Sequence, residues 1–286
     1  MQKGFAGVME LEQKRAHLES RLRELGGVLV AYSGGVDSAY LAYAAHRMLG
    51  DQMLAVIADS ASLARSHFDD ALSFAREHSI PLRVLTTSEL DHPDYVKNDA
   101  TRCFHCKDEL FTVMEQERQR SGFQHLAYGM NVDDRGEFRP GQQAAKLHSV
   151  LAPLAEAGLT KQDIRTLAQQ AGLRIWDKPA SACLASRVEY GRPVTKEVLE
   201  QVERGEALLQ RMGFRQFRVR YHGEMARIEI AREEMPRALS METMDRMAKG
   251  FRALGFKFVS LDCEGYRSGS MNDILPVETI QPANFL

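Results

Sequence analysis

The sequence predicts an α/β protein in which a parallel, doubly wound sheet is followed by a smaller α+β domain. Two observations lead to this prediction. Short apolar runs alternate with segments of helical apolar spacing up to about residue 130, a pattern typical of a parallel, doubly wound sheet. Beyond Val188 the pattern changes to long helical segments around strands with alternating faces. We therefore expect two domains, residues 1–187 and 188–286.

Length and composition agree with two folded domains. The chain has 286 residues, of which 44% are apolar and 27% charged. Lys and Arg number 37 against 39 Asp and Glu, so the net charge of −2 provides no overall field that favours nucleic acid. The first residues lack the pattern of a signal peptide, and no run of about 18 apolar residues predicts a membrane span. We expect a cytoplasmic protein.

The elements of the first domain follow in order. Leucines at helical spacing predict a helix that ends at Leu25, because Gly26 and Gly27 follow it. Strands are expected over 28–32, 53–59, 82–87 and 125–130. Helices are expected over 39–49, 64–79 and 108–120. Polar residues follow the strands at 33–38, 59–60, 86–87 and 129–134. Since parallel sheets bind ligands at the carboxyl ends of their strands, these clusters predict a site at that edge.

The second domain is predicted to be a small sheet packed on helices. A helix is expected over 195–213, and strands over 214–222 and 226–231 join through Gly223 as an antiparallel hairpin. One long helix is expected over 232–255 and a last strand over 256–263. The tail over 276–286, with two prolines and no periodicity, is expected to be loose.

The turn SGGVDS after the first strand has the features of a phosphate cradle. Gly34 and Gly35 let the backbone approach a ligand, and the amides that follow begin a helix, whose N-terminus favours an anion. Ser33 and Ser38 can donate hydroxyl hydrogens, and Asp37 can hold Mg²⁺ or the first-turn amides. Neither a dinucleotide fingerprint nor a Walker loop is present. A connector without a ligand is the alternative.

SGGVDS after a strand resembles the pyrophosphate loop of the PP-loop ATP pyrophosphatases. Four further stretches resemble the LarE family of ATP-dependent sulfur transferases: RCFHCKDELF at 102–111, GMNVDDRGEFRPG at 129–141, WDKPASACLASR at 176–187 and LDCEGYRSGSMN at 261–272. The resemblance spans nearly the whole chain.

This resemblance implies a Rossmann-like sheet of about five parallel strands and a homo-oligomer. It implies an enzyme that uses ATP and Mg²⁺ to adenylate a carboxylate of a pyridinium dicarboxylate mononucleotide. The carboxylate then becomes a thiocarboxylate of the nickel-pincer nucleotide cofactor. In the ATP site we include Asp59 and Ser60, which end the second predicted strand.

Cys183 is the candidate nucleophile. A thiolate attacks an acyl adenylate far better than a thiol does, and Lys178 and Arg187 nearby in the sequence would favour the ionised form. The alternative is a small, buried, apolar cysteine. The resemblance implies that in some family members this residue gives up its own sulfur and becomes dehydroalanine.

Cys103 and Cys106 form a CxxC pair. The resemblance implies that, in members with three cysteines, a [4Fe-4S] cluster binds sulfide at its open iron, so these two and Cys183 are the expected ligands. A zinc site, completed by His105 or Cys263, or a redox pair is the alternative. Cys263 itself is expected to pack within the last strand.

Four residues of the second domain are candidates for substrate binding: Arg218, Arg220, Glu229 and Arg267. Arg218 and Arg220 alternate along one strand and therefore share a face, where guanidinium groups could bind a phosphate. Glu229, on the returning strand, could orient an arginine or bind a metal ion, and Arg267 lies in the polar turn GYRSGS. A solvated sheet face is the alternative.

The sequence thus predicts adenylation at the glycine turn and sulfur transfer at Cys183, with a small molecule as substrate and neither nucleic acid nor membrane as partner. A PP-loop tRNA thiolase is the main rival, although no basic stripe supports it. An ATP-dependent amidating ligase would leave the cysteines without a role. A nucleotide sensor would bind ATP without releasing pyrophosphate.

Overall fold

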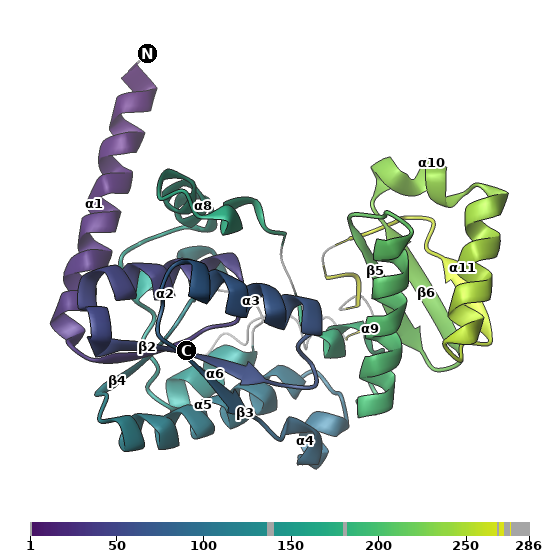
Figure 1. Ribbon diagram of the computed structural model, residues 1–286, viewed down its shortest axis with the longest axis horizontal. Helices are drawn as coiled ribbons and strands as arrows, with labels where there is room; N and C mark the ends of the chain where they lie inside the picture. Colours follow the sequence, from purple (N-terminus) through teal and green to yellow (C-terminus); the bar gives the residue numbers. More distant parts are fainter. Residues whose placement is uncertain (1, 136–139, 180–181, 268, 272–274, 276–286) are drawn as a thin grey trace. The chain divides into compact units, whose positions relative to one another are not determined.

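The computed structural model describes residues 2–135, 140–179, 182–267, 269–271 and 275, and forms two compact units (Figure 1). The first unit comprises residues 1–60, 65–88 and 103–181, and the second comprises 61–64, 89–102 and 182–286. The expected domains, 1–187 and 188–286, are continuous in sequence, and that division stays a prediction. Ser268 and the expected loose tail lie outside the described residues.

A parallel sheet forms the centre of the first unit. Its strands are β1 (Val28–Ala31), β2 (Met53–Asp59), β3 (Leu82–Thr86) and β4 (His125–Tyr128), in the order β3-β2-β1-β4. Leu151 extends the pairing by a parallel bridge to Ala127. The expected α/β class is confirmed. Because the strand order reverses between β1 and β4, their carboxyl ends are the place where such a sheet binds ligands.

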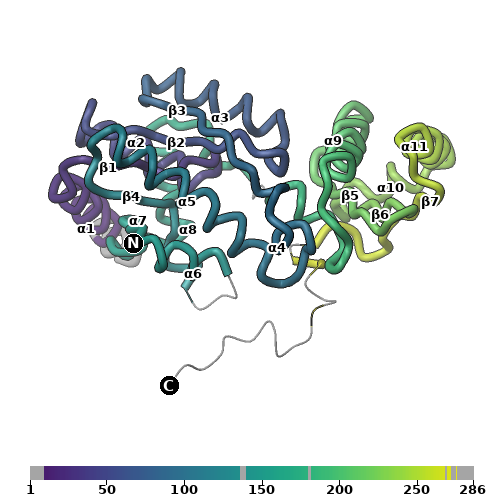
Figure 2. Tube along the Cα trace, turned by 90° about the horizontal axis from the view of Figure 1, so that it is seen from below, coloured from purple at the N-terminus to yellow at the C-terminus, as the bar shows by residue number. Residues whose placement is uncertain are grey.

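Helices cover both faces of this sheet, which explains the apolar runs of its inner strands. β1 is buried along its whole length, and α2 (Val36–Leu49) packs on it. α1 (Gln2–Leu25) and α8 (Lys161–Gln170) pack in turn against α2. Phe111 and Met114 of α5 (Arg102–Ser121) bury the other face with α6 (Pro140–Leu147) (Figure 2). α3 (Arg65–Glu77) and the short α7 (Pro153–Glu156) complete the helices described in this unit. A strand buried on both faces has no need of alternating polar residues.

The second unit has a three-stranded mixed sheet in the order β5-β6-β7. β5 (Phe217–His222) and β6 (Met225–Ile230) form the expected antiparallel hairpin through Gly223, and β7 (Phe258–Leu261) pairs with β6 in parallel. α9 (Lys196–Arg211) and α11 (Met241–Ala253) pack on one face around Val219, Ile228 and Phe251. The short α4 (Pro93–Val96) belongs to this unit although its sequence lies within the first half of the chain.

Three expected elements differ in the structure. The helix predicted over 232–255 is divided into a 3-10 turn, α10 (Met235–Ala238) and α11, because Ser240 accepts a hydrogen bond from the Thr243 amide and starts a new helix. α5 begins at Arg102 rather than at 108. The last strand ends at Leu261, so Cys263 lies in an exposed turn and our expectation that it packs in a strand is wrong.

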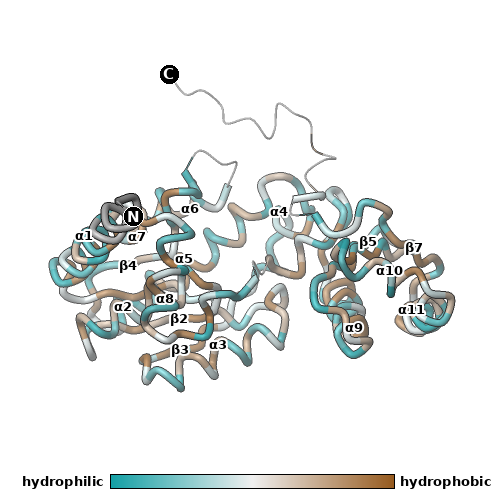
Figure 3. Tube along the Cα trace, turned by 90° about the horizontal axis from the view of Figure 1, so that it is seen from above, coloured by the Kyte–Doolittle hydropathy of each residue, from teal (hydrophilic) through white to brown (hydrophobic). Residues whose placement is uncertain are grey.

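Hydrophilic and hydrophobic residues alternate along the outer helices, as expected for helices with one buried face (Figure 3). None of the helices in the described ranges is long and apolar enough to cross a membrane.

Candidate functional site

The glycine turn is held together by its own residues. Ser38 Oγ accepts a hydrogen bond from the Ser33 amide (3.1 Å), donates to the Gly35 carbonyl (3.1 Å) and lies 3.1 Å from Ser33 Oγ. Gly35 is the N-cap of the 14-residue α2 and has no side chain with which to cap the first amides. These amides and the helix dipole therefore suit an anion such as a phosphate.

Two glycines allow the backbone around this turn to pack closely. Gly34 has φ +71°, and a Cβ there would lie 2.6 Å from Ala71 Cβ of α3. A Cβ on Gly129, directly after β4, would lie 2.7 Å from the Ser38 amide nitrogen. No side chain fits at either position, so the end of β4 and the middle of α3 confine the turn.

Asp37 is paired with a lysine that the sequence analysis did not select. Lys161 Nζ lies 2.5 Å from Asp37 Oδ2, and the Lys161 amide donates to Asp133 (2.8 Å). Lys161 starts α8, where Thr160 and Asp163 form a reciprocal capping box. A threonine followed three residues later by an acid is a sequence signal for a helix start, so this signal could have located the lysine.

The other carboxylate oxygen of Asp37 fits a ligand. Oδ1 is buried and makes no hydrogen bond of normal geometry among the described residues, although the Asn131 side chain lies near enough to the carboxylate to oppose the rise of its pKa. Burial raises the pKa of Asp37 above its ordinary value, an effect that Lys161 opposes and the negative charge of Asp134 reinforces. A Mg²⁺ ion held by one or two carboxylates and by substrate phosphates needs few protein ligands. This donor set therefore fits Mg²⁺, although the described residues contain no group of three or more His, Cys, Asp or Glu arranged to hold a metal.

Asp59 and Ser60 follow β2 at the same edge of the sheet. Arg65 Nη1 lies 2.5 Å from Asp59 Oδ1, and Arg65 Nη2 donates to the Ser60 carbonyl (2.8 Å). Asp59 is in register with Thr86 at the end of β3. The expected polar edge is thus present at β1, β2 and β3.

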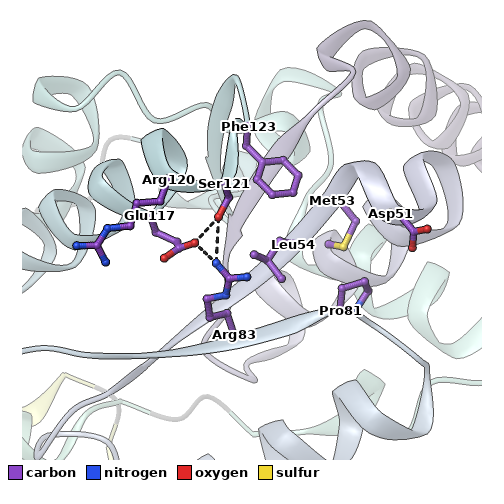
Figure 4. Close-up of a pocket in the computed structure, with 9 residues that line it drawn as sticks. All are labelled: Asp51, Met53, Leu54, Pro81, Arg83, Glu117, Arg120, Ser121 and Phe123. Carbon is purple, nitrogen blue, oxygen red and sulfur yellow. Dashed lines mark hydrogen bonds and ion pairs between the residues drawn. The ribbon is translucent and has the colours of Figure 1, made fainter.

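An open pocket lies at the opposite edge of this sheet (Figure 4). Its lining includes Met53 and Pro81, at the amino ends of β2 and β3, and an ion pair between Arg83 and Glu117 that also contacts Ser121. Because Arg83 and Glu117 already satisfy one another, this pocket does not supply the phosphate-binding groups found at the turn.

Cys103 and Cys106 lie in the first turn of α5. Residues three apart on a helix lie on the same side, so the two thiols can share a ligand. Cys103 is exposed and Cys106 partly buried, and no disulfide joins the four cysteines, all of which are described. Gly141 of α6 approaches this turn, since a Cβ there would lie 3.3 Å from the Cys103 carbonyl.

Cys183 lies in the second unit and begins the 3-10 turn Leu184–Arg187. Arg187 binds main-chain carbonyls of this turn and a carboxylate. Its Nη1 donates to the carbonyls of Ala182 (2.6 Å) and Cys183 (2.8 Å), while its Nε and Nη2 bind Glu206 at 2.9 and 3.2 Å. In the first unit, Lys178 is paired with Asp70 (3.5 Å). Both cations that were expected to favour the thiolate are therefore engaged by carboxylates.

The arginine face exists, and its centre is Glu229. Strand register places Arg218 opposite Glu229 and Arg220 opposite Arg227, so all four side chains share one face. Glu229 is fully buried; it pairs with Arg220 (2.8 Å) and Arg227 (3.3 Å) and accepts a hydrogen bond from Ser270 Oγ (2.7 Å). Two arginines and a hydroxyl group thus hold one carboxylate.

Arg220 connects this face to the Cys183 turn. Its Nη1 donates to the Ser186 carbonyl (3.2 Å), and its Nε is buried without a partner in the part of the chain that the structure describes. Burial, followed by the positive charge of Arg187, holds the pKa of Arg218 below its ordinary value. Arg267 is more exposed and pairs with Glu264 (2.6 Å). The second unit therefore brings Cys183, Arg218, Arg220 and Glu229 into one connected cluster.

Comparisons with known proteins cover almost the whole chain. An uncharacterized protein of Synechocystis is 38% identical over 265 residues, 93% of this chain and 99% of that protein. The pyridinium-3,5-bisthiocarboxylic acid mononucleotide synthase of Lactiplantibacillus plantarum is 35% identical over 93% of this chain and 96% of its own. A GMP synthase of Rippkaea orientalis is 30% identical over 42% of this chain and 24% of its own. No family model matches the chain.

Proposed function

Since the chain belongs to the LarE family of ATP-dependent sulfur transferases, we propose that it converts a carboxylate of a pyridinium dicarboxylate mononucleotide to a thiocarboxylate in nickel-pincer cofactor synthesis. The observation that carries the proposal is the similarity to the L. plantarum synthase along nearly the full length of both chains. The shorter similarity to GMP synthases, together with the glycine turn, supports an adenylating half-reaction.

The first half-reaction is assigned to the turn of residues 33–38. The amides at the start of α2 would bind the β- and γ-phosphates of ATP while a substrate carboxylate attacks the α-phosphorus and pyrophosphate leaves. Asp37 would hold Mg²⁺, which neutralises charge on the phosphates when bound. Lys161, 2.5 Å from Asp37, is placed to add positive charge beside the leaving pyrophosphate. Asp59 and Ser60 would contact the nucleoside end of ATP.

The second half-reaction is assigned to Cys183. If Cys183 gives up its own sulfur, its thiolate displaces AMP from the acyl adenylate and forms a thioester. Loss of the Cys183 α-proton then breaks the Cβ–S bond, which releases the thiocarboxylate and leaves dehydroalanine.

Of the two possible sources of the transferred sulfur, we favour a [4Fe-4S] cluster held by Cys103, Cys106 and Cys183 over the sulfur of Cys183 itself. When bound, such a cluster would supply a sulfide at the iron that no cysteine ligates. The spacing of the two cysteines on the first turn of α5 supports it. Arg102, which precedes Cys103 in the sequence, donates to the Ala185 carbonyl, two residues after Cys183.

The mononucleotide phosphate is assigned to the arginine face. The Nε of Arg220 is buried and has no partner among the described residues. Arg218 is partly buried near the positive charge of Arg187, so a bound anion would offset the repulsion between these two cations. Glu229 would orient Arg220, and Arg267 would contact the substrate from its more exposed turn. We further propose a cytoplasmic homo-oligomer that binds neither nucleic acid nor membrane, with a nucleotide-binding domain over 1–187 and a substrate domain over 188–286.

The test uses anaerobically purified protein with ATP, Mg²⁺ and pyridinium-3,5-dicarboxylate mononucleotide. We expect pyrophosphate release and a thiocarboxylate product with this substrate and neither with tRNA. Cys183→Ala should still release pyrophosphate but form no thiocarboxylate, whereas Cys263→Ala should behave as the parent. Full sulfur transfer by Cys183→Ala would contradict the assignment.

Product and metal analysis separate the alternatives. Thiolated tRNA would identify a tRNA thiolase, an amide formed with ammonia an amidating ligase, and ATP binding without pyrophosphate a sensor. Iron and sulfide in the protein would support the cluster, while loss of hydrogen sulfide from Cys183 after turnover would support the sacrificial version.

A further inference from the structure

Three arginines bind the carbonyl groups of the Cys183 turn, and we call them the arginine collar: Arg187 belongs to the turn itself, whereas Arg102 and Arg220 come from distant segments of the chain. The bonds join Arg187 to the carbonyls of residues 182 and 183, Arg102 to that of residue 185 and Arg220 to that of residue 186. A hydrogen bond from a charged donor is stronger than one from a neutral donor. The collar therefore holds four carbonyls of one short turn.

The collar is buried as well as charged. Arg102, Arg187 and Arg220 are 4%, 1% and 5% exposed. Burying a guanidinium group is unfavourable unless its donors are satisfied, so each collar member requires its partners to stay in place. A change in the turn would leave buried donors without acceptors, which makes the observed turn geometry strongly preferred.

Arg102 acts together with Asn98. Arg102 Nη1 lies 2.5 Å from Asn98 Oδ1 as well as 2.9 Å from the Ala185 carbonyl. Asn98 is fully buried with φ +57°, and its Nδ2 donates to the carbonyls of Glu189 (2.8 Å) and Arg192 (2.9 Å). The segment 89–102 thus fixes the turn itself and the chain that leaves it.

We propose that Arg102, oriented by Asn98, is a positioning residue that sets the place of the Cys183 sulfur for the transfer step. The proposal rests on the function assigned above and deepens it. The transferred sulfur, whether that of Cys183 or a sulfide held beside it, must lie about 3–3.5 Å from the carbon that it attacks, and an error of about 1 Å can cost roughly 100-fold in rate. Arg220 contacts both the turn and Glu229, so the collar also sets the distance between the sulfur and the arginine face.

The kinetic test compares the two half-reactions in Arg102→Ala and Arg102→Lys. We expect Arg102→Ala to release pyrophosphate within about twofold of the parent rate but to form thiocarboxylate about 100-fold more slowly. Arg102→Lys, whose ammonium group can donate to the same two oxygens, should recover most of the transfer rate. The matched control is Arg118→Ala on the same helix, which loses only an exposed bond to the Gln124 carbonyl and should match the parent.

A second measurement does not depend on the reaction. Iodoacetamide alkylation of the native protein, read peptide by peptide, should label Cys183 several-fold faster in Arg102→Ala than in the parent because the turn is released. Cys263, in its exposed turn, is the internal reference and should keep its rate.

A parallel loss of both half-reactions, or unchanged transfer together with unchanged labelling of Cys183, would overturn the positioning role. If Arg102→Ala does not fold, Arg102→Met, which fills most of the same buried volume but cannot donate to the Ala185 carbonyl, takes its place in the same two measurements. A parent protein that forms no thiocarboxylate would refute the proposed function, while the labelling comparison would still test the collar.

Discussion

The glycine turn and the Cys183 turn are built in opposite ways. The hydrogen bonds that shape residues 33–38 join residues three or five positions apart. The Cys183 turn has local bonds too, from Ser186 and Arg187 to the Cys183 carbonyl, but it also depends on two distant bonds. The Ser62 carbonyl accepts from the Leu184 amide, and Arg102 donates to the carbonyl of Ala185, 83 residues away. A turn made from local bonds can be recognised in a short stretch of sequence, whereas a turn made from distant bonds cannot. The Arg102 variants described above test the Cys183 turn, and the four predictions below test the glycine turn and the first unit around it, starting with the largest effect.

Asp37→Asn should lower the rate of pyrophosphate release about 100- to 1,000-fold. The substitution removes the charge that would hold Mg²⁺ and that pairs with Lys161, and losing one preorganised electrostatic group costs about this much. Asp51→Asn, in the pocket at the opposite edge of the sheet, is the control and should keep the parent rate. If the two substitutions lowered the rate of pyrophosphate release equally, the glycine turn would not be the site of adenylation.

Gly34→Ala should destabilise the first unit by about 2–4 kcal/mol. The left-handed backbone costs about 1 kcal/mol, and a Cβ 2.6 Å from Ala71 adds an overpacking cost of about 1–3 kcal/mol. Gly158→Ala is the matched control, because Gly158 has φ +72° but no atom within 4 Å of the added Cβ. It should cost only about 1 kcal/mol in urea denaturation. Equal losses would show that close packing does not shape the turn.

Thr160→Ala should cost about 1 kcal/mol of stability and also raise the KM for ATP several-fold. It removes the N-cap that fixes the start of α8 and therefore the place of Lys161. Ser240→Ala removes a comparable cap from α11 in the second unit and should lower stability without changing the KM. If the KM for ATP did not change in Thr160→Ala, Lys161 would have no part in ATP binding.

His148 gives the smallest expected effect and tests a distant contact inside the first unit. Its Nε2 and Nδ1 lie 2.9 and 3.1 Å from Asp108 and Glu115 of α5. Burial lowers the pKa of His148, but the two carboxylates outweigh it and hold the pKa above the ordinary value. The stabilisation is therefore complete below about pH 6.5 and is lost as the pH rises through the raised pKa.

Urea denaturation at pH 6 and pH 8 measures this contribution. Between these values the parent should lose about 0.2–1 kcal/mol more stability than His148→Gln, the range typical of partly exposed ion pairs. Identical pH dependence in the two proteins would show that the long-range pair adds nothing.

The sequence predicted the features that local patterns encode. The apolar runs of the central strands, the Gly-Gly turn at 34–35 and the hairpin through Gly223 were all found at their expected places. The shared face of Arg218 and Arg220 follows from strand periodicity and is also present.

What the sequence did not predict depends on contacts between distant residues. Lys161 and Arg102 acquire their partners only when segments far apart in the chain meet. The residues at the start of α5, from Arg102, do not show the apolar spacing of a helix, so the sequence did not reveal that α5 begins there. The break before α11 arises from one N-cap, Ser240, within a stretch whose apolar spacing is helical throughout. Such features need either a capping signature, as Thr160 and Asp163 offered, or the fold itself.

The segment 89–102 has a consequence for synthesis on the ribosome. Asn98 donates to carbonyls at residues 189 and 192, which are translated about 90 residues later. At roughly 5–20 residues per second, this delay lasts about 5–20 s. During that time the Asn98 side-chain amide lacks these two acceptors, while β1, β2 and β3 can already pair. Translation rate between codons 102 and 192 therefore controls how long the nascent chain stays open to proteases and chaperones.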